Sequence, residues 1–193
     1  MLVETDSHAR REALDRGLEE VCQSPRDRGT VELIVRRPAE GEREVLEVGE
    51  LDREVGMVGD NWSTRGSSRT ADGSSHPQMQ LNLMSSRVAA LVAGERSRWP
   101  LAGDQLYVDL DLSAENLPPG TLLTLGTATI EVTPMPHTGC KKFVERFGMD
   151  AMRWISSPRG RALNLRGINA AVVRPGKVRV GDAIAKAGTA AEA

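Results

Sequence analysis

Cysteines, aromatic residues and long hydrophobic runs are all scarce in this sequence of 193 residues. The two cysteines, Cys22 and Cys140, form no CxxC pair and are too few for the disulfide framework of a small secreted domain. Aromatic residues make up only 3% of the chain, so its core must rest on aliphatic side chains. No apolar run approaches the roughly 20 residues of a membrane span, and the N-terminus has no signal-peptide hydrophobic region. We therefore expect a cytoplasmic protein with free thiols and no membrane association.

The chain also lacks a strong overall charge. Its formal net charge of −2 argues against a nucleic-acid partner, because nucleic-acid-binding domains are usually clearly basic. The charge is unevenly distributed, since residues 134–180 contain 10 basic and only 2 acidic side chains. This segment predicts a local site for an anionic ligand.

Hydrophobic periodicity predicts a mainly β fold with a few short helices. Residues 8–22 have helical spacing, and Cys22 on their apolar side is interpreted as a packed small hydrophobe. From Thr30 the period changes to two, and Ser85 or Ser86 is expected to cap a short helix. We expect strands within 31–35, 45–51, 79–84, 106–112, 122–132 and 170–182, which is typical of a barrel-like domain.

Residues 63–78 are rich in Ser, Thr and Gly and contain Arg65 and Arg69. Composition alone favours a surface loop. The alternative is a phosphate-contacting loop, in which small residues free backbone N–H groups and arginine supplies a bidentate fork. Arg65 and Arg69 are therefore candidate residues for binding an anionic cofactor.

Cys140 is the main candidate for chemistry. Two prolines and a glycine precede it in Pro134-Met135-Pro136-His137-Thr138-Gly139, and a helix is expected to begin at or just after it. Unpaired N–H groups and the positive end of the helix dipole favour a thiolate there. Lys141 and Lys142 add positive charge, and a protonated His137 would add more. A thiolate at this position can carry sulfur, attack an electrophile or ligate a soft metal, whereas the alternative role is an inert cap.

The helical segment that follows is expected to be interrupted at Gly148 and to resume near Asp150. Ser157, Arg159 and Arg161 come next and are candidates for holding a phosphate. The alternative for the basic residues of this segment is a solvated surface, which is the interpretation for Arg146, Arg159, Arg161 and Arg166. The pair Gly59-Asp60 is likewise interpreted as ordinary turn chemistry.

Several segments occur in an order that resembles the MOSC domain family. They are Gly56-Met57-Val58-Gly59-Asp60, Gln80-Leu81-Asn82-Leu83-Met84, Ala114-Glu115-Asn116-Leu117, the 126–133 strand before the cysteine, and Gly176-Lys177-Val178-Arg179-Val180-Gly181-Asp182. The resemblance covers about residues 30–186. It divides the chain into an N-terminal helical extension (1–29), a MOSC domain (30–186) and a flexible tail (187–193). The approach Pro-His-Thr-Gly-Cys differs from the Arg-x-Pro-Cys type of many members, which indicates a distinct branch.

The resemblance implies a MOSC-type β-barrel in which Cys140 either carries sulfur as a persulfide or binds molybdenum in the molybdenum cofactor (molybdopterin). Pyridoxal phosphate is not expected, because the chain is too short to contain the upstream desulfurase of the sulfurases. Sulfur would then come from a donor such as a separate cysteine desulfurase. Two alternatives stay open: a molybdenum-cofactor-dependent reductase of N-hydroxylated compounds, and a non-catalytic module that binds an anionic cofactor or small molecule.

Overall fold

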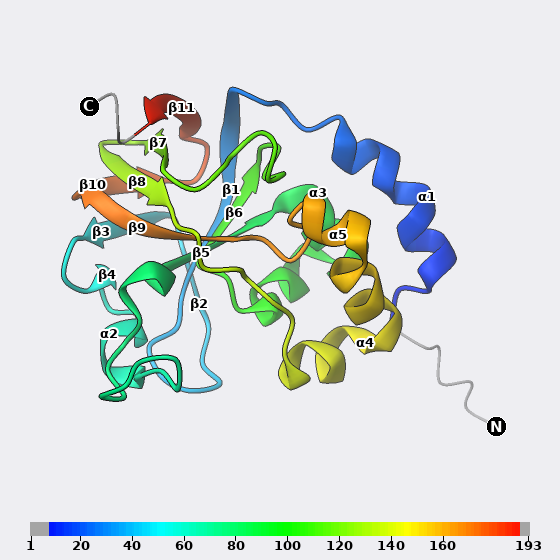
Figure 1. The fold of residues 1–193 in the computed structure, drawn as a ribbon, viewed down its shortest axis with the longest axis horizontal. Coiled ribbons are helices and arrows are strands. Elements are labelled where there is room, and N and C mark those ends of the chain that lie inside the picture. The colour runs from blue at the N-terminus through cyan, green and yellow to red at the C-terminus, as the bar shows by residue number, and fades with distance from the viewer. Residues whose placement is uncertain (1–7, 190–193) are drawn as a thin grey trace.

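The computed structural model describes residues 8–189, and its centre is a closed barrel of seven strands (Figure 1). The hydrogen-bonded order is β11-β7-β8-β9-β5-β6-β1, and pairing of β1 with β11 closes the ring. Every neighbouring pair is antiparallel except β5 and β6. The barrel strands are β1 (Arg28–Arg36), β5 (Leu81–Ser85), β6 (Leu106–Asp109), β7 (Thr121–Leu125), β8 (Ala128–Val132), β9 (Ile168–Arg174) and β11 (Ala183–Thr189).

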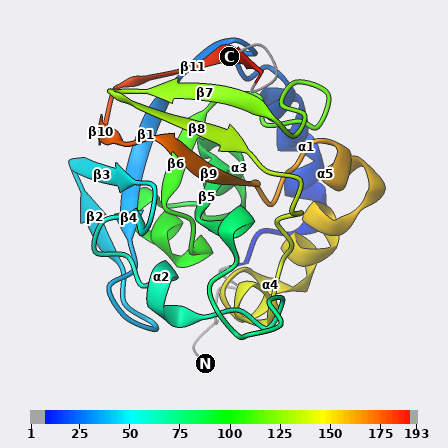
Figure 2. The same cartoon turned by 60° about the vertical axis from the view of Figure 1, so that its left-hand side comes forward.

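A smaller sheet lies beside the barrel. It contains β10 (Gly176–Arg179), β3 (Val48–Asp52) and β4 (Gly56–Met57), while β2 (Glu44–Leu46) extends β1. The helices α1 (Arg11–Cys22), α3 (Ser86–Ala93), α4 (Lys141–Ser156) and α5 (Pro158–Ala162) gather on one side of the barrel in both ribbon views (Figures 1 and 2). Three shorter elements complete the fold: α2 (Trp62–Arg65), η1 (Pro77–Met79) and η2 (Arg96–Ala102).

Alternating side chains of the barrel strands form two separate cores. Leu83 and Val108 point into the barrel, where they pack with other aliphatic residues. Met84 and Tyr107, their strand neighbours, join a second core against the helices. Side chains alternate between the two faces of a strand, so β5 and β6 are buried on both sides. The helix-side core holds most of the few aromatic residues, including Phe143 at the start of α4.

These observations confirm the predicted β-barrel with few helices. The helix predicted over 8–22 begins at Arg11, and Leu14 and Leu18 bury its apolar face in the helix-side core. The packed role of Cys22 is wrong, because its side chain is exposed at the end of α1. Its position next to Val21, which is buried, places it just off the buried side of the helix.

Residues 183–189 form β11, which continues past residue 187, where the predicted flexible tail begins. Ile184 is fully buried and pairs with Leu125 of β7 and Gly29 of β1. Residues 190–193 of that predicted tail, and residues 1–7 of the predicted N-terminal extension, lie outside the described residues. The domain boundaries at 29/30 and 186/187 stay predictions.

Candidate functional site

Cys140 occupies the N-cap position of α4, at the end of the loop that leaves β8. Its carbonyl oxygen accepts hydrogen bonds from the N–H groups of Phe143 and Val144, at 2.9 and 3.2 Å. Its side chain is exposed and makes no capping hydrogen bond to the backbone. The expected helix start is thus confirmed, and the thiol is accessible rather than used as a cap.

A relay of buried polar side chains ties this loop to the barrel. Arg37 Nη1 donates to Asn82 Oδ1 at 3.0 Å, and Asn82 Nδ2 donates to Asn169 Oδ1 at 2.6 Å. Asn169 Nδ2 then donates to the carbonyl oxygen of Met135, five residues before Cys140, at 2.9 Å. Since all three side chains are buried, these bonds fix the loop against β5 and β9.

Cys140 lines a cleft of about 450 Å³, which we call the cationic cleft. The cleft lies where the loop after β1, the 61–69 segment, the Cys140 loop and the start of α4 meet. Seven of its lining residues are basic: Arg37, Arg43, Arg65, Arg69, Lys142, Arg146 and Arg166. A site of this size and charge suits a small organic anion.

Arg37 is held by a buried carboxylate behind the cleft. Its Nε and Nη2 donate to Asp60 Oδ2 and Oδ1 at 2.9 and 2.8 Å, and its backbone N–H donates to Oδ2 at 2.9 Å. Asp60 also accepts from the N–H of Trp62 at 3.0 Å. Its interpretation as ordinary turn chemistry is therefore incomplete, because Asp60 anchors an arginine of the cleft.

Arg166 forms the second buried pair. Its Nη1 donates to Asp104 Oδ1 and Oδ2 at 3.0 and 2.8 Å, and its Nη2 donates to the Ala102 carbonyl oxygen at 2.9 Å. Complete burial raises the pKa of Asp104, and Arg166 counteracts that rise. Arg166 is 7% exposed, so the prediction of a solvated surface is wrong for it. Arg146 lines the same cleft instead of lying on a separate surface.

His137 lies next to this pair, with its Nδ1 3.4 Å from Asp104 Oδ1. Burial lowers the pKa of His137 well below its ordinary value, and the charges of Arg166 and Arg37 lower it further. The imidazole is therefore neutral near pH 7 and does not add the positive charge that a protonated His137 would bring. Its place in the cleft wall makes it a potential hydrogen-bonding group.

Four arginines of the cleft (Arg43, Arg65, Arg69 and Arg146) have no carboxylate within 4 Å in the part of the chain described here. Burial lowers the pKa of Arg43, and its neighbours Arg146 and Arg37 lower it further. Burial and Arg37 act in the same direction on the pKa of Arg65. Since these guanidinium groups remain charged near pH 7, a bound anion would relieve their mutual repulsion.

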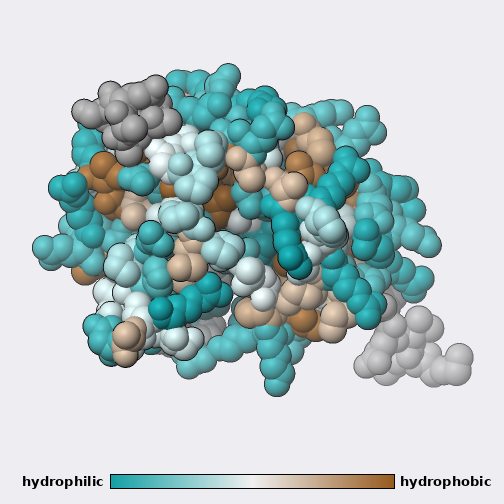
Figure 3. Space-filling model, viewed as in Figure 1, coloured by the Kyte–Doolittle hydropathy of each residue, from teal (hydrophilic) through white to brown (hydrophobic). Residues whose placement is uncertain are grey.

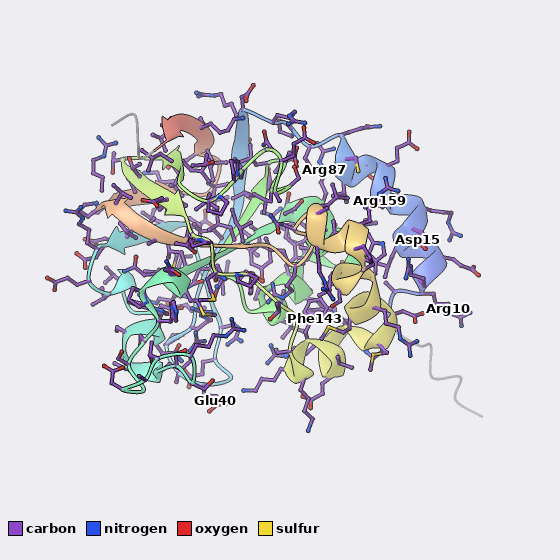
Figure 4. The ribbon with its side chains drawn as sticks, in the orientation of Figure 1. Arg10, Asp15, Glu40, Arg87, Phe143 and Arg159 are labelled. Carbon is purple, nitrogen blue, oxygen red and sulfur yellow. The ribbon has the colours of Figure 1, made fainter. Side chains whose placement is uncertain are left out.

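Lys142 and Glu40 form an ion pair across the rim of the cleft, with Nζ 2.6 Å from Oε1. Figure 4 labels Glu40 at the tip of the loop between β1 and β2, beside the start of α4. Both side chains are more than half exposed, so the pair can open when a ligand competes for Lys142.

Four predicted cofactor-binding residues do not line the cationic cleft. Lys141 is exposed and points to Glu145, with 3.9 Å between Nζ and Oε1. Ser157 caps α5, because its Oγ accepts from the Gly160 N–H at 3.0 Å. Arg159 is exposed on α5, on the α1 side of the molecule in Figure 4. Arg161 lines a neighbouring cleft of about 450 Å³ that shares His137 and Arg166 with the cationic cleft.

Sequence reasoning missed Arg37, Arg43 and Asn82. Asn82 stood inside one of the family-like segments, and Arg37 is a charged residue at the end of an apolar strand. A charged side chain next to an apolar strand needs an oppositely charged partner if it is buried, but nothing in the sequence indicates that the partner of Arg37 is Asp60. The face of the molecule in Figure 3 is mostly hydrophilic, with scattered apolar areas.

No group of three or more His, Cys, Asp or Glu side chains within residues 8–189 is arranged to hold a metal ion. Cys140 offers one ligand, so a metal bound to it would have to arrive with its other ligands. The helices of the described region include none that is long and apolar enough to cross a membrane. A cytoplasmic location stays a prediction.

Comparison with known proteins supports the fold. The family model described as MOSC domain matches residues 76–185. The crystal structure of YuaD from Bacillus subtilis is similar with a TM-score of 0.61 and 19% identity, covering 81% of this chain and 94% of that one. YiiM from Escherichia coli has a TM-score of 0.53 and 19% identity, covering 81% of this chain and 69% of that one. YiiM from Geobacillus stearothermophilus has a TM-score of 0.51 and 13% identity, covering 84% of this chain and 74% of that one. Among curated proteins, none matches the sequence.

Proposed function

The chain belongs to the MOSC domain family, and from this premise we propose that its cationic cleft binds the molybdenum cofactor with the Cys140 thiolate as a metal ligand. The observation that carries the proposal is the position of one exposed thiol on the wall of a cleft with four arginines that have no carboxylate partner among residues 8–189. A phosphate-bearing pterin with its own dithiolene ligands has the matching charge and supplies the remaining metal ligands.

The residues of the cleft fit such a group. Arg65 and Arg69 offer guanidinium forks for a phosphate, which is the geometry arginine recognises best. Arg43 already donates to the carbonyl oxygens of Pro100 and Glu42 and adds positive charge to the cleft. Three buried polar atoms of the cleft wall (Asn61 Oδ1, His137 Nδ1 and Arg166 Nε) have no hydrogen-bond partner within the described residues. Donors and acceptors of a polar heterocycle would satisfy them.

Each residue then has a distinct role. Cys140 holds the metal, Arg65 and Arg69 hold the phosphate, and the Arg37–Asn82–Asn169 relay keeps the Cys140 loop in place. The neutral His137 can exchange a hydrogen bond with the ligand without adding charge. When bound, the cofactor would supply the capacity to transfer oxygen atoms or electrons, which amino-acid side chains lack.

Metal analysis of protein purified from a host that makes the cofactor tests the proposal. We expect stoichiometric molybdenum in the wild type and in Cys22→Ser, and its loss in Cys140→Ser. Cys22→Ser is the matched control, because it removes the other exposed thiol. Molybdenum retained in Cys140→Ser would overturn the role of Cys140.

A persulfide carrier is the second candidate, favoured by the exposure of Cys140. In that case Cys140 would gain the mass of one sulfur atom after incubation with a cysteine desulfurase and cysteine, and the protein would contain no molybdenum. Anion binding that is unchanged in Cys140→Ser, without molybdenum or persulfide, would instead identify a non-catalytic anion-binding module.

A further inference from the structure

Five buried side-chain atoms within residues 8–189 have no hydrogen-bond partner, and they fall at two places. Three of them line the cationic cleft, as described above. The other two, Ser24 Oγ and Ser85 Oγ, both line a second cleft of about 310 Å³. Unsatisfied buried polar atoms are rare in native proteins, so this second pair indicates a polar occupant of the second cleft.

The second cleft lies between the end of α1, the segment that follows β6, and α5. The ribbon views place α1 and α5 on the same side of the barrel (Figures 1 and 2). Apolar side chains provide much of its wall: Val21, Val88, Leu110, Leu112 and Leu163. None of the seven basic residues of the cationic cleft lines it.

The two serine hydroxyls are not used by the surrounding secondary structure. Ser85 occupies the N-cap position of α3, where a serine hydroxyl normally accepts a hydrogen bond from the helix, yet it makes none. Ser24 follows α1 and is also without a partner at its Oγ. Both residues are almost fully buried, at 6% exposure for Ser24 and 5% for Ser85. Both residues line the second cleft, so a molecule bound there is placed to supply the missing hydrogen-bond partner.

Cys22 and three charged residues also line this cleft. The thiol of Cys22 is exposed. Arg26 stands between two carboxylates, with its Nη2 3.2 Å from Glu115 Oε1 and its Nη1 3.9 Å from Asp111 Oδ2. Because the Arg26–Glu115 pair is largely exposed, a ligand that carries both a carboxylate and an ammonium group can exchange partners with it.

We infer that the second cleft binds a small zwitterionic disulfide and that Cys22 is its site of modification. The carboxylate of the ligand pairs with Arg26 and its ammonium group with Asp111 or Glu115. Its polar backbone reaches the hydroxyls of Ser24 and Ser85. The proposal combines three features of the cleft: the thiol, the two unpartnered hydroxyls and the charge pattern.

The reaction is a thiol–disulfide exchange. The Cys22 thiol loses its proton to solvent, and the thiolate attacks one sulfur of the disulfide. A bond forms between Sγ and that sulfur while the original S–S bond breaks. The other half leaves as a thiolate and takes up a proton. Cys22 is oxidised to a mixed disulfide, and the departing half is reduced to a free thiol.

The test uses the full chain with Cys140→Ser, so that Cys22 is the remaining thiol and the outcome is independent of the proposed function. The protein is incubated with glutathione disulfide, and in parallel with uncharged bis(2-hydroxyethyl) disulfide. Intact-mass spectrometry follows modification over time. We expect modification by glutathione disulfide to slow by about fivefold or more in Arg26→Gln, because the charged ligand loses its partner. The rate with the uncharged disulfide should stay the same.

Ser85→Ala provides the matched test of the hydroxyls. It should slow the reaction with glutathione disulfide by several fold and leave alkylation of Cys22 by iodoacetamide unchanged, which shows that the thiol is equally accessible. Equal glutathione disulfide rates in the Cys140→Ser parent and in its Arg26→Gln and Ser85→Ala variants would overturn the proposal and indicate that the cleft holds water. A variant that fails to fold would be recognised by circular dichroism, and Ser24→Ala would replace it.

Discussion

Two buried carboxylates, Asp60 and Asp104, hold two arginines of the cationic cleft, Arg37 and Arg166, in place. Asp60 accepts hydrogen bonds from Nε and Nη2 of Arg37, and both oxygens of Asp104 accept from Nη1 of Arg166. Neither carboxylate side chain has any exposed area. Because a buried charge is costly unless paired, these residues act as fixed anchors rather than as solvated charges.

Asp60→Asn should destabilise the fold by about 3–5 kcal/mol, because it leaves the Arg37 guanidinium buried without its counter-charge. Asp15→Asn is the matched control, since Asp15 pairs with Arg11 on the exposed side of α1 (Figure 4). That control should change the free energy of unfolding by no more than about 0.5 kcal/mol. Urea denaturation of both variants measures the difference, and equal small effects would contradict the anchoring role of Asp60.

Because the pKa of His137 is lowered in the folded state, we expect the free energy of unfolding to depend on pH. The folded-state pKa of His137 lies well below 6.5, so the unfolded chain binds a proton first as the pH falls. Its contribution is therefore fully present above pH 6.5 and is lost as the pH falls from 6.5 towards the folded-state pKa. The slope attributable to this residue should approach about 1.4 kcal/mol per pH unit.

His137→Gln should remove that slope. Urea denaturation at several pH values between 7 and 5 measures it as the difference between wild type and variant, which cancels the other titrating groups. Parallel stability curves for the two proteins would show that His137 is not the proton-sensitive group.

At the scale of secondary structure, prediction succeeded where burial repeats with a fixed period. Leu106 and Val108 alternate with Tyr107, so β6 follows from the sequence, and α1 follows from Leu14 and Leu18. β11 was missed because Ala183–Thr189 is mostly small residues and its strand character comes from pairing with β1 and β7. Propensity does not report such tertiary pairing.

The interruption of α4 at Gly148 was predicted and is present, with φ of 84° and ψ of 170°. Gly148→Ala should cost about 1–3 kcal/mol, since this conformation is nearly restricted to glycine. A Cβ there would also lie 2.9 Å from His8 Nδ1. Gly181→Ala is the control for a positive φ alone, because a Cβ there meets nothing within 4 Å. Thermal denaturation should show the larger loss for Gly148→Ala, and the reverse order would contradict the packing against His8.

At the scale of the whole molecule, the cationic cleft collects residues that are up to 129 positions apart, from Arg37 to Arg166. The sequence predicted Cys140, Lys142, Arg65 and Arg69 because each stands in a recognisable local context. It could not separate them from Lys141, Ser157 and Arg159, since only the closed barrel and the direction of each helix decide which side chains face the cleft. A net charge of −2 likewise conceals this cluster.

The concentration of positive charge predicts anion binding that depends on salt. Inorganic pyrophosphate should raise the melting temperature of the wild type at low ionic strength, because a ligand that binds the folded state stabilises it by mass action. The increase should shrink at about 0.5 M NaCl, where charges are screened over a few ångströms. The double variant Arg65→Gln/Arg69→Gln should lose most of the increase. Lys141→Gln/Arg159→Gln removes the same number of positive charges outside the cleft and should keep it. Equal losses in the two double variants would mean that pyrophosphate responds to net charge and not to the cleft.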